Sequence, residues 1–516
     1  AEMAWNFMSS GNPTAVVNYY NPNDNMLSFF GRLNYDYKSR YSLGATLRAD
    51  GSSKFAAGNR WGFFPSAAAS WTISNEAFMS KFTGLRLLKL RYSFGTAGNN
   101  NIPTGQIVKI YSPHAVSEIA ATISSGDIYM TAGSVMNNPD LTWETTYTHN
   151  IGLDFGVLDG KVAGSLEVYQ NDTENLLINF PISGVGYASQ YQNIGSTRNR
   201  GVELTLNMPL ISKADYSLNL SGNIAYNKNT VSSLGGLTKI SSNSEWASTE
   251  IDSDYIVEVG QPLGNMNGYV FDGFYTTDDM TWDGAKWVLN DGVVDCSSLL
   301  GSAYMRPGAP KFKNLDGDEA NTPDKTIIGN ASPDFSGGFA LSGYFKGLDF
   351  SANFTFMIGN DVYNANKIEF NSSRKFTTLR NLTNMMDVDK RWTNIDWETG
   401  KIVNDAERLN AMNAGKTMFS PFTQNAIFSD WAVEDASFLR FQSATIGYTL
   451  PGKLTTKAFI KKARLYVTGT NLFCWTKYSG YDPEVDTRRS TPLTPGVDYS
   501  AYPKSIGCVF GLNITF

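Results

Sequence analysis

Apolar and polar residues alternate with a period of two in many segments of the chain. In the last of these, every second residue from Ile506 to Phe516 is apolar, and mostly small or polar residues stand between them. Such alternation puts successive side chains on opposite faces of a β-strand, whereas a helix would need apolar residues three and four positions apart. The pattern therefore predicts a strand here. The twelve other segments with the same pattern are 27–37, 41–50, 62–73, 86–98, 143–157, 160–173, 197–210, 214–228, 335–346, 348–359, 437–450 and 462–476.

Short and long connections alternate between these segments. Tight links follow Tyr37, Val157, Leu210 and Phe345. Most predicted strands are about as long as the roughly 9–11 residues that a tilted strand needs to cross a bilayer. Outer-membrane barrels have tight turns on one rim and long loops on the other. We therefore predict an all-β fold, a transmembrane antiparallel β-barrel. Its long extracellular loops are expected at 99–142, 229–334, 360–436 and 477–504.

The number of predicted strands points to a larger barrel. Bacterial single-chain barrels close with an even number of strands, whereas we count thirteen. An apolar first strand cannot leave its backbone edge unpaired in lipid. No segment has the length and apolar content expected of a domain that plugs a barrel. We therefore expect residues 1–516 to be the C-terminal barrel region of a larger plugged barrel, with no plug domain in this chain.

Composition excludes several other classes of protein. No apolar run reaches about 18 residues, which argues against a helical membrane protein. The 42 basic and 48 acidic residues give a net charge of −6 without a basic block, so no nucleic-acid partner is expected. Three distant cysteines and two histidines offer little for zinc binding, disulfide pairing or catalysis, and we predict that the protein is not an enzyme. Cys508 falls on the apolar face of its strand and is expected to face lipid.

Short motifs spread along the chain carry a family resemblance. They are RADGSSKF at 48–55, NRWGFFPS at 59–66, LRYSFGTAGN at 90–99, NPDLTWE at 138–144, NIG at 193–195, NRGVE at 199–203, SFLR at 437–440, TNLF at 470–473 and YSGYDPE at 478–484. In this order and over nearly the whole chain, they resemble the SusC/RagA family of TonB-dependent outer-membrane transporters. The terminal Phe516 resembles the aromatic end residue by which the outer-membrane assembly machinery recognises its clients.

The resemblance implies a fold, a location and partners. It implies a plugged barrel of about 22 strands, surrounded by lipid in the outer membrane of a Gram-negative, Bacteroidetes-like bacterium. Its partners would be a SusD-like surface lipoprotein that caps the barrel and the plug-bearing N-terminal portion of the same transporter. The TonB complex would act through that N-terminal portion, which this chain lacks. The resemblance also allows a dimer of transporter–lipoprotein pairs, and it implies the import of glycans or peptides.

Two alternatives remain open from the sequence. A passive outer-membrane porin would fit the missing plug, and a soluble all-β protein, such as a glycan-binding fibre or an adhesin, would fit the strands alone. The sequence does not distinguish a glycan cargo from a peptide cargo. No cofactor is required for either activity.

Three sets of residues are candidates for a functional site. Alternation puts the polar residues of the first two strands on the face that would line the lumen or hold the plug, namely Arg32, Asn34, Asp36, Arg48 and Asp50. Tryptophans in the two longest loops could stack on cargo, since aromatic rings bind sugar rings and apolar side chains, or they could form the loop cores. These tryptophans are Trp246, Trp282, Trp287, Trp392 and Trp397.

The third set resembles a calcium-binding loop. Side-chain oxygens at alternate positions suit a hard cation, and Asn314, Asp316, Asp318 and Asp324 supply them. Glu319, however, occupies the position where such a loop has its turn glycine. Calcium is therefore one prediction for this segment, and a solvated acidic turn is the alternative.

Overall fold

The computed structural model describes most of the chain. The described residues are 24–109, 111–115, 128–182, 186–247, 250–373, 381–423, 425–487 and 492–516. The chain divides into two compact units. The first unit consists of Ala1–Leu206 and Asn229–Thr238, and the second consists of Asn207–Lys228 and Lys239–Phe516. Strands dominate both units. Among the described residues, no helix is long and apolar enough to pass through a membrane.

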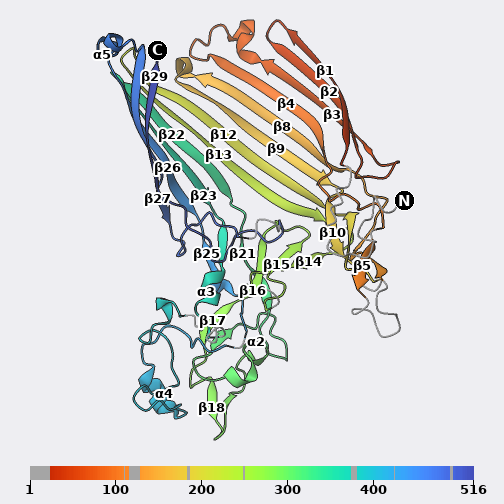
Figure 1. Cartoon of the computed structure of the whole chain (residues 1–516), viewed down its shortest axis with the longest axis vertical. Helices are drawn as coiled ribbons and strands as arrows, with labels where there is room; N and C mark the ends of the chain where they lie inside the picture. The colour runs from red at the N-terminus through yellow and green to blue at the C-terminus, as the bar shows by residue number, and fades with distance from the viewer. Residues whose placement is uncertain are drawn as a thin grey trace. The chain divides into compact units, whose positions relative to one another are not determined.

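Thirteen long strands form one sheet, each paired with its neighbours in chain order (Figure 1). They are β1 (Met26–Tyr37), β2 (Tyr41–Ser52), β3 (Trp61–Thr72), β4 (Leu87–Asn99), β8 (Glu144–Val157), β9 (Val162–Glu174), β12 (Ser196–Ser212), β13 (Tyr216–Ser233), β22 (Phe335–Phe345), β23 (Leu348–Ile358), β26 (Phe438–Thr449), β27 (Lys462–Thr476) and β29 (Gly507–Thr515). Pairing is antiparallel from β1 to β9 and again from β13 to β29. All thirteen predicted strands are therefore confirmed, with bounds that differ by a few residues.

Shorter elements occupy the connections. In the first unit they are β5 (Tyr111–Ala115), β6 (Ile128–Ala132), β7 (Val135–Met136), β10 (Leu177–Pro181) and β11 (Ser189–Asn193). In the second unit the short strands are β14 (Lys239–Ser242), β15 (Tyr255–Glu258), β16 (Asn265–Tyr269), β17 (Phe271–Phe274), β18 (Met280–Trp282), β19 (Trp287–Leu289), β20 (Pro310–Phe312), β21 (Lys325–Asn330), β24 (Asp361–Asn364), β25 (Val433–Asp435) and β28 (Val497–Asp498). The α-helices described there are α2 (Ser297–Leu300), α3 (Ala365–Glu369), α4 (Ala406–Met412) and α5 (Gly452–Thr455).

The exposed face of the long strands is the apolar one. Along β2 the apolar side chains Tyr41, Leu43 and Leu47 are exposed, whereas Ser42 and Thr46, which alternate with them, are half-buried. Leu43 and Leu47 are 55% and 56% exposed. In a water-soluble sheet the apolar face would pack on a core, and monomeric soluble proteins rarely expose a wide apolar surface. The order seen here is that of strands that face lipid.

The tight links predicted between strands are formed by chemically suited turns. β22 and β23 are joined by Lys346 and Gly347 alone, and Phe345 pairs with Leu348 across the turn. Both turn residues have positive φ angles, 45° and 93°, as a type I′ hairpin turn requires. Glycine is suited to the second of these positions because it has no Cβ to clash.

Two of the long loops fold together in the second unit. We call residues 239–334 and 360–436 the loop body; Figure 1 shows α2, α3 and α4 gathered there with the short strands, beyond the ends of β22 and β23. One of its cores contains Tyr255, Tyr363 and Phe428, and another contains Tyr275, Cys296 and Trp392. The sequence predicted loops at these positions, with a place in loop cores as one alternative for the tryptophans, but not which residues share a core. Each core combines short segments that are distant in the sequence, so periodicity within one segment does not show it.

Candidate functional site

The polar residues predicted to share one face of β1 and β2 do so. Arg32 Nε donates to Asn34 Oδ1 at 3.1 Å, and Arg48 Nε lies 2.7 Å from Asp50 Oδ2. Asp36 accepts a hydrogen bond from Ser42 on the neighbouring strand. The register of the two strands thus confirms their common face. That this face lines a lumen or holds a plug stays a prediction.

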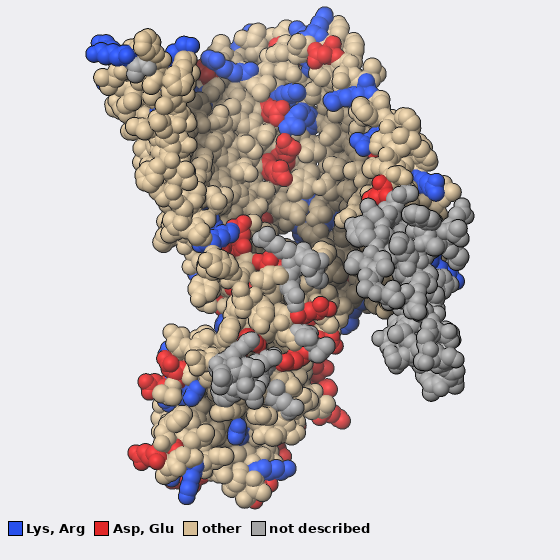
Figure 2. Space-filling model, viewed as in Figure 1, with Lys and Arg blue, Asp and Glu red and all other residues tan. Residues whose placement is uncertain are grey.

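The same face carries an ion-pair network that the sequence did not reveal. Arg91 on β4 bonds Asp154 on β8 at 2.7 Å and Glu167 on β9 at 3.0 Å, and Asn150 also donates to Glu167. Figure 2 shows a group of acidic and basic side chains on a face of the strands that is otherwise largely uncharged. Alternation does place these residues on the polar face. Their pairing could not be predicted, because a long loop connects β4 and β8 and the sequence does not show which residues of the two strands lie opposite each other.

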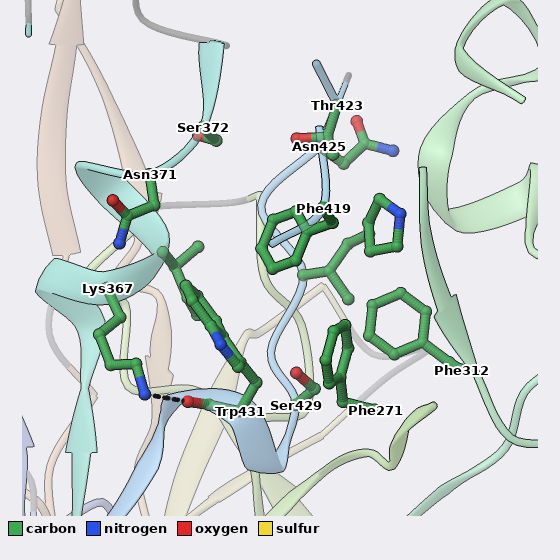
Figure 3. Close-up of a pocket in the computed structure, with 13 residues that line it drawn as sticks. Phe271, Phe312, Lys367, Asn371, Ser372, Phe419, Thr423, Asn425, Ser429 and Trp431 are labelled. Atoms are coloured by element: carbon green, nitrogen blue, oxygen red, sulfur yellow. Dashed lines mark hydrogen bonds between the residues drawn. The ribbon is translucent and has the colours of Figure 1, made fainter. Parts of the chain in front are cut away.

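An aromatic pocket lies within the loop body (Figure 3). It is a hollow of about 420 Å³, part of it open to solvent. Its lining comes from β17, β20, α3 with Asn371 and Ser372 just beyond it, and residues between Phe419 and Trp431. The residues labelled in Figure 3 are Phe271, Phe312, Lys367, Asn371, Ser372, Phe419, Thr423, Asn425, Ser429 and Trp431. None of them was a candidate from the sequence, since the pocket combines four short segments that are distant in the sequence.

Four rings form a continuous wall of this pocket. Trp431 packs edge-to-face on Phe419 with 5.1 Å between ring centroids, and Phe419 packs the same way on Phe271 at 5.7 Å. Phe271 in turn meets Phe312 at 6.2 Å. Edge-to-face packing is a favoured arrangement for aromatic pairs and fixes the ring orientations. The wall is therefore an ordered apolar surface.

Among the described residues that line the pocket, Lys367 is the one that carries a charge. Its ammonium group lies 4.7 Å from the centre of the Trp431 ring and donates to the backbone oxygen of Trp431. Glu434 Oε1 lies 3.5 Å from the same nitrogen. Burial lowers the pKa of Lys367, and the charge of Glu434 offsets part of that shift. The positive charge is thus neutralised next to the pocket.

Glu434 links the pocket to the YSGYDPE motif. Its carboxylate accepts hydrogen bonds from the backbone N–H and the hydroxyl of Ser479, at 2.9 and 2.8 Å. Asp482 of the same motif pairs with Arg440 of the SFLR motif at 2.6 Å, and both side chains are largely buried. Two family-like motifs whose first residues, 437 and 478, are 41 positions apart therefore meet through Arg440, which also lies 3.7 Å from Glu484. The contact joins β26 to the segment that follows β27.

Burial separates the five tryptophans into two groups. Trp246, Trp287 and Trp392 are at most 8% exposed and belong to the loop-body cores. At this burial the three side chains present almost no surface to a cargo. The alternative prediction, that these tryptophans form the loop cores, describes them. Trp282 is half-buried against Trp287. Trp397 is 59% exposed, and its contact with cargo stays a prediction.

The acidic segment after β20 is held by its own hydrogen bonds. Asp324 accepts from the backbone N–H groups of Leu315 and Asp316, and Asn314 accepts from that of Gly317. Asp318 accepts from the backbone N–H of Asn321. These bonds turn oxygens toward the peptide backbone, as in a solvated acidic turn. Within the ranges that the structure describes, no group of three or more His, Cys, Asp and Glu residues is arranged to hold a metal ion. A calcium site here stays a prediction.

The three cysteines lie in different environments and are unpaired. Cys296 is buried in a loop-body core, Cys474 is half-buried, and Cys508 is exposed. Cys508 stands opposite Gly469 of β27. Phe516, the predicted assembly residue, follows the last strand and is 75% exposed. Its recognition during assembly also stays a prediction.

Comparison with known proteins gives consistent matches. Residues 3–355 match a family described as TonB dependent receptor-like, beta-barrel. The chain is 28% identical to TonB-dependent receptor P3 of Formosa agariphila, over 100% of this chain and 48% of that protein. It is 30% identical to TonB-dependent receptor SusC of Bacteroides thetaiotaomicron, over 96% of this chain and 44% of that protein.

A solved structure supports the same fold. The structure described as the RagAB peptide transporter aligns with 95% of this chain and 48% of that chain, with a TM-score of 0.72 and 25% sequence identity. The chain thus spans about half the length of the relatives that it matches.

Proposed function

Because this chain belongs to the TonB dependent receptor-like β-barrel family, we propose that it forms much of the barrel wall of an outer-membrane nutrient importer. The observation that carries this proposal is the exposure of the apolar face of the long strands, with the charged network on the opposite face. A barrel that spans a membrane needs lipid-facing apolar side chains and a polar interior. A soluble adhesin would bury the face that is exposed here.

Glycans or peptides are the proposed cargo, captured at the long-loop ends of the strands. The aromatic pocket of the loop body is the proposed capture site, because ligand sites combine an apolar hollow with a few fixed polar groups. A SusD-like lipoprotein would cover this side of the barrel, and the plug-bearing portion of the transporter would receive energy from TonB. The names of the relatives, SusC and RagAB, support this arrangement.

Uptake measured in cells tests the proposal. The intact transporter gene is deleted and restored in the source bacterium, and uptake of labelled peptides and oligosaccharides is followed with and without a functional TonB. We expect the transporter-dependent uptake to disappear when TonB is absent. Uptake that requires the transporter but continues without TonB would instead identify a passive porin.

A second measurement tests the location. Membranes from the same cells are separated, and the protein is extracted first with buffer and then with detergent. We expect it in the detergent fraction of the outer membrane, with a gel mobility that changes on heating. Recovery of the folded protein in buffer alone would contradict a membrane barrel.

A further inference from the structure

We infer that the aromatic pocket of the loop body binds one uncharged apolar side chain of a peptide cargo. This inference rests on the proposed function and names the cargo class for the same site. The pocket is lined by the ring wall of Phe271, Phe312, Phe419 and Trp431. Ile368, Ile427 and Pro310 extend this apolar part of the lining. Removal of apolar surface from water is therefore the main attraction that it offers a ligand.

The size of the hollow suits a side chain better than a longer ligand. Its volume of about 420 Å³ includes space that is open to solvent. The space that the protein itself encloses is therefore smaller than this figure. A leucine or phenylalanine side chain can enter it while the rest of the cargo stays outside.

Polar groups occupy the other side of the pocket from the Phe271 and Phe312 rings. Figure 3 shows Ser372 and Asn371 on one side, with Thr423 and Asn425 near the segment that carries Phe419. Within the described part of the chain, Ser372 Oγ is buried and has no hydrogen-bond partner. A buried hydroxyl without a partner costs free energy, which a ligand that supplies an N–H or C=O group would recover. A peptide backbone supplies both.

The lining argues against a sugar ring and against a charged side chain. A sugar ring can lay its C–H face on one aromatic ring, but a wall of four rings offers no partners to the hydroxyls around its rim. No carboxylate is among the described residues that line the pocket, so a cationic side chain would find no anionic partner among them. Lys367 is already held by Trp431 and Glu434, so an anionic side chain would compete with an existing ion pair.

Peptide binding to the intact transporter, purified with its lipoprotein in detergent, tests this inference. The probes are three hexapeptides that differ only in one central residue, which is Leu, Ser or Asp, together with maltohexaose. Full burial of a leucine side chain contributes enough to tighten binding about 10-fold to 100-fold. We expect the Leu peptide to bind at least about 10-fold more tightly than the Ser peptide, with the Asp peptide weakest.

Two variants connect this preference to the pocket. Phe419→Ala removes the central ring of the wall, and Phe419→Leu keeps an apolar side chain there. We expect F419A to abolish the difference between the Leu and Ser peptides, and F419L to retain most of it. Ile402→Ala is the matched control, since Ile402 is an exposed apolar residue of the loop body that does not line the pocket. Its preference should equal that of the wild type.

Other outcomes overturn the inference. Equal binding of the three peptides by the wild type would do so, and so would tight binding of maltohexaose that is lost in F419A. Uptake in cells separates this failure from failure of the proposed function. If TonB-dependent uptake is the same in F419A as in the wild type, the pocket assignment is refuted and the importer function is supported. Leucine-selective binding lost in F419A, without any TonB-dependent uptake, refutes the importer and keeps the pocket.

Discussion

The carboxylate of Glu434 joins segments that are distant in the sequence through hydrogen bonds and an ion pair. It accepts two hydrogen bonds from Ser479 and lies beside Lys367. Burial raises the pKa of Glu434, but the bonds from Ser479 and the charge of Lys367 outweigh burial, so that pKa lies below its ordinary value. A carboxylate whose folded pKa is lowered stabilises the fold above its unfolded pKa. This stabilisation is lost as the pH falls through the folded pKa.

The backbone amide of Ser479 should report the charge of Glu434. We expect its protection from hydrogen exchange to hold from pH 7 to about pH 5, and to fall once the pH drops below about 4, the usual range of glutamate. In Glu434→Gln, protection should be weaker at pH 7 and insensitive to pH across this interval. Glu398→Gln, at an exposed loop position, serves as the control and should behave as the wild type. An equal loss of protection on acidification in E434Q and the wild type would rule out this role.

At the scale of the strands, glycines provide space for aromatic rings on the neighbouring strand. Tyr466 of β27 lies directly opposite Gly511 of β29. A Cβ atom at position 511 would lie 2.0 Å from Tyr466 Cζ, far closer than atoms can approach. The Arg464 guanidinium lies 4.9 Å from the centre of the same ring and bonds Asp349 on β23. Displacement of Tyr466 would therefore disturb three strands.

Gly511→Val should destabilise the intact transporter by about 1–3 kcal/mol, the usual cost of overpacking. The measurement is the midpoint of urea unfolding in detergent, read from the gel mobility of the folded form. Gly31→Val is the matched control, because a Cβ at Gly31 of β1 meets no atom of the described residues within 4 Å. Were G511V and G31V to unfold at the same midpoint, the ring over Gly511 would have no role in holding the strands.

Strand positions could be predicted from the sequence, but strand partners on the polar face and the loop cores could not. Alternation acts within one strand, so the segment ending at Phe516 could be assigned without its neighbours. Arg91 and Glu167, by contrast, are brought together by the registers of two strand pairs. Cys296 and Trp392 share a core although nearly a hundred residues separate them. Only contacts in the folded chain determine which loop aromatics are buried and which form the pocket wall.

At the scale of the whole molecule, the exposed apolar face requires delivery into a membrane. The resemblance assigns the recognition step to Phe516, which is exposed after the last strand. Deletion of Phe516 should lower the amount of heat-modifiable transporter in the outer membrane. Phe516→Tyr keeps an aromatic end and should assemble normally. Phe510→Leu changes another exposed phenylalanine near the C-terminus and should also assemble. Normal insertion of the deletion variant would refute a role for the terminal ring.

The exposure of Cys508 gives this chain a native position for chemical labelling. Cys296 is buried and Cys474 is half-buried, so a mild thiol reagent should modify Cys508 first. A spin label attached there would stand on the side of β29 that carries its apolar side chains. The enhancement of spin-label relaxation by oxygen and by lipid-bound nickel would then give the depth of the strand in the bilayer, without any introduced cysteine.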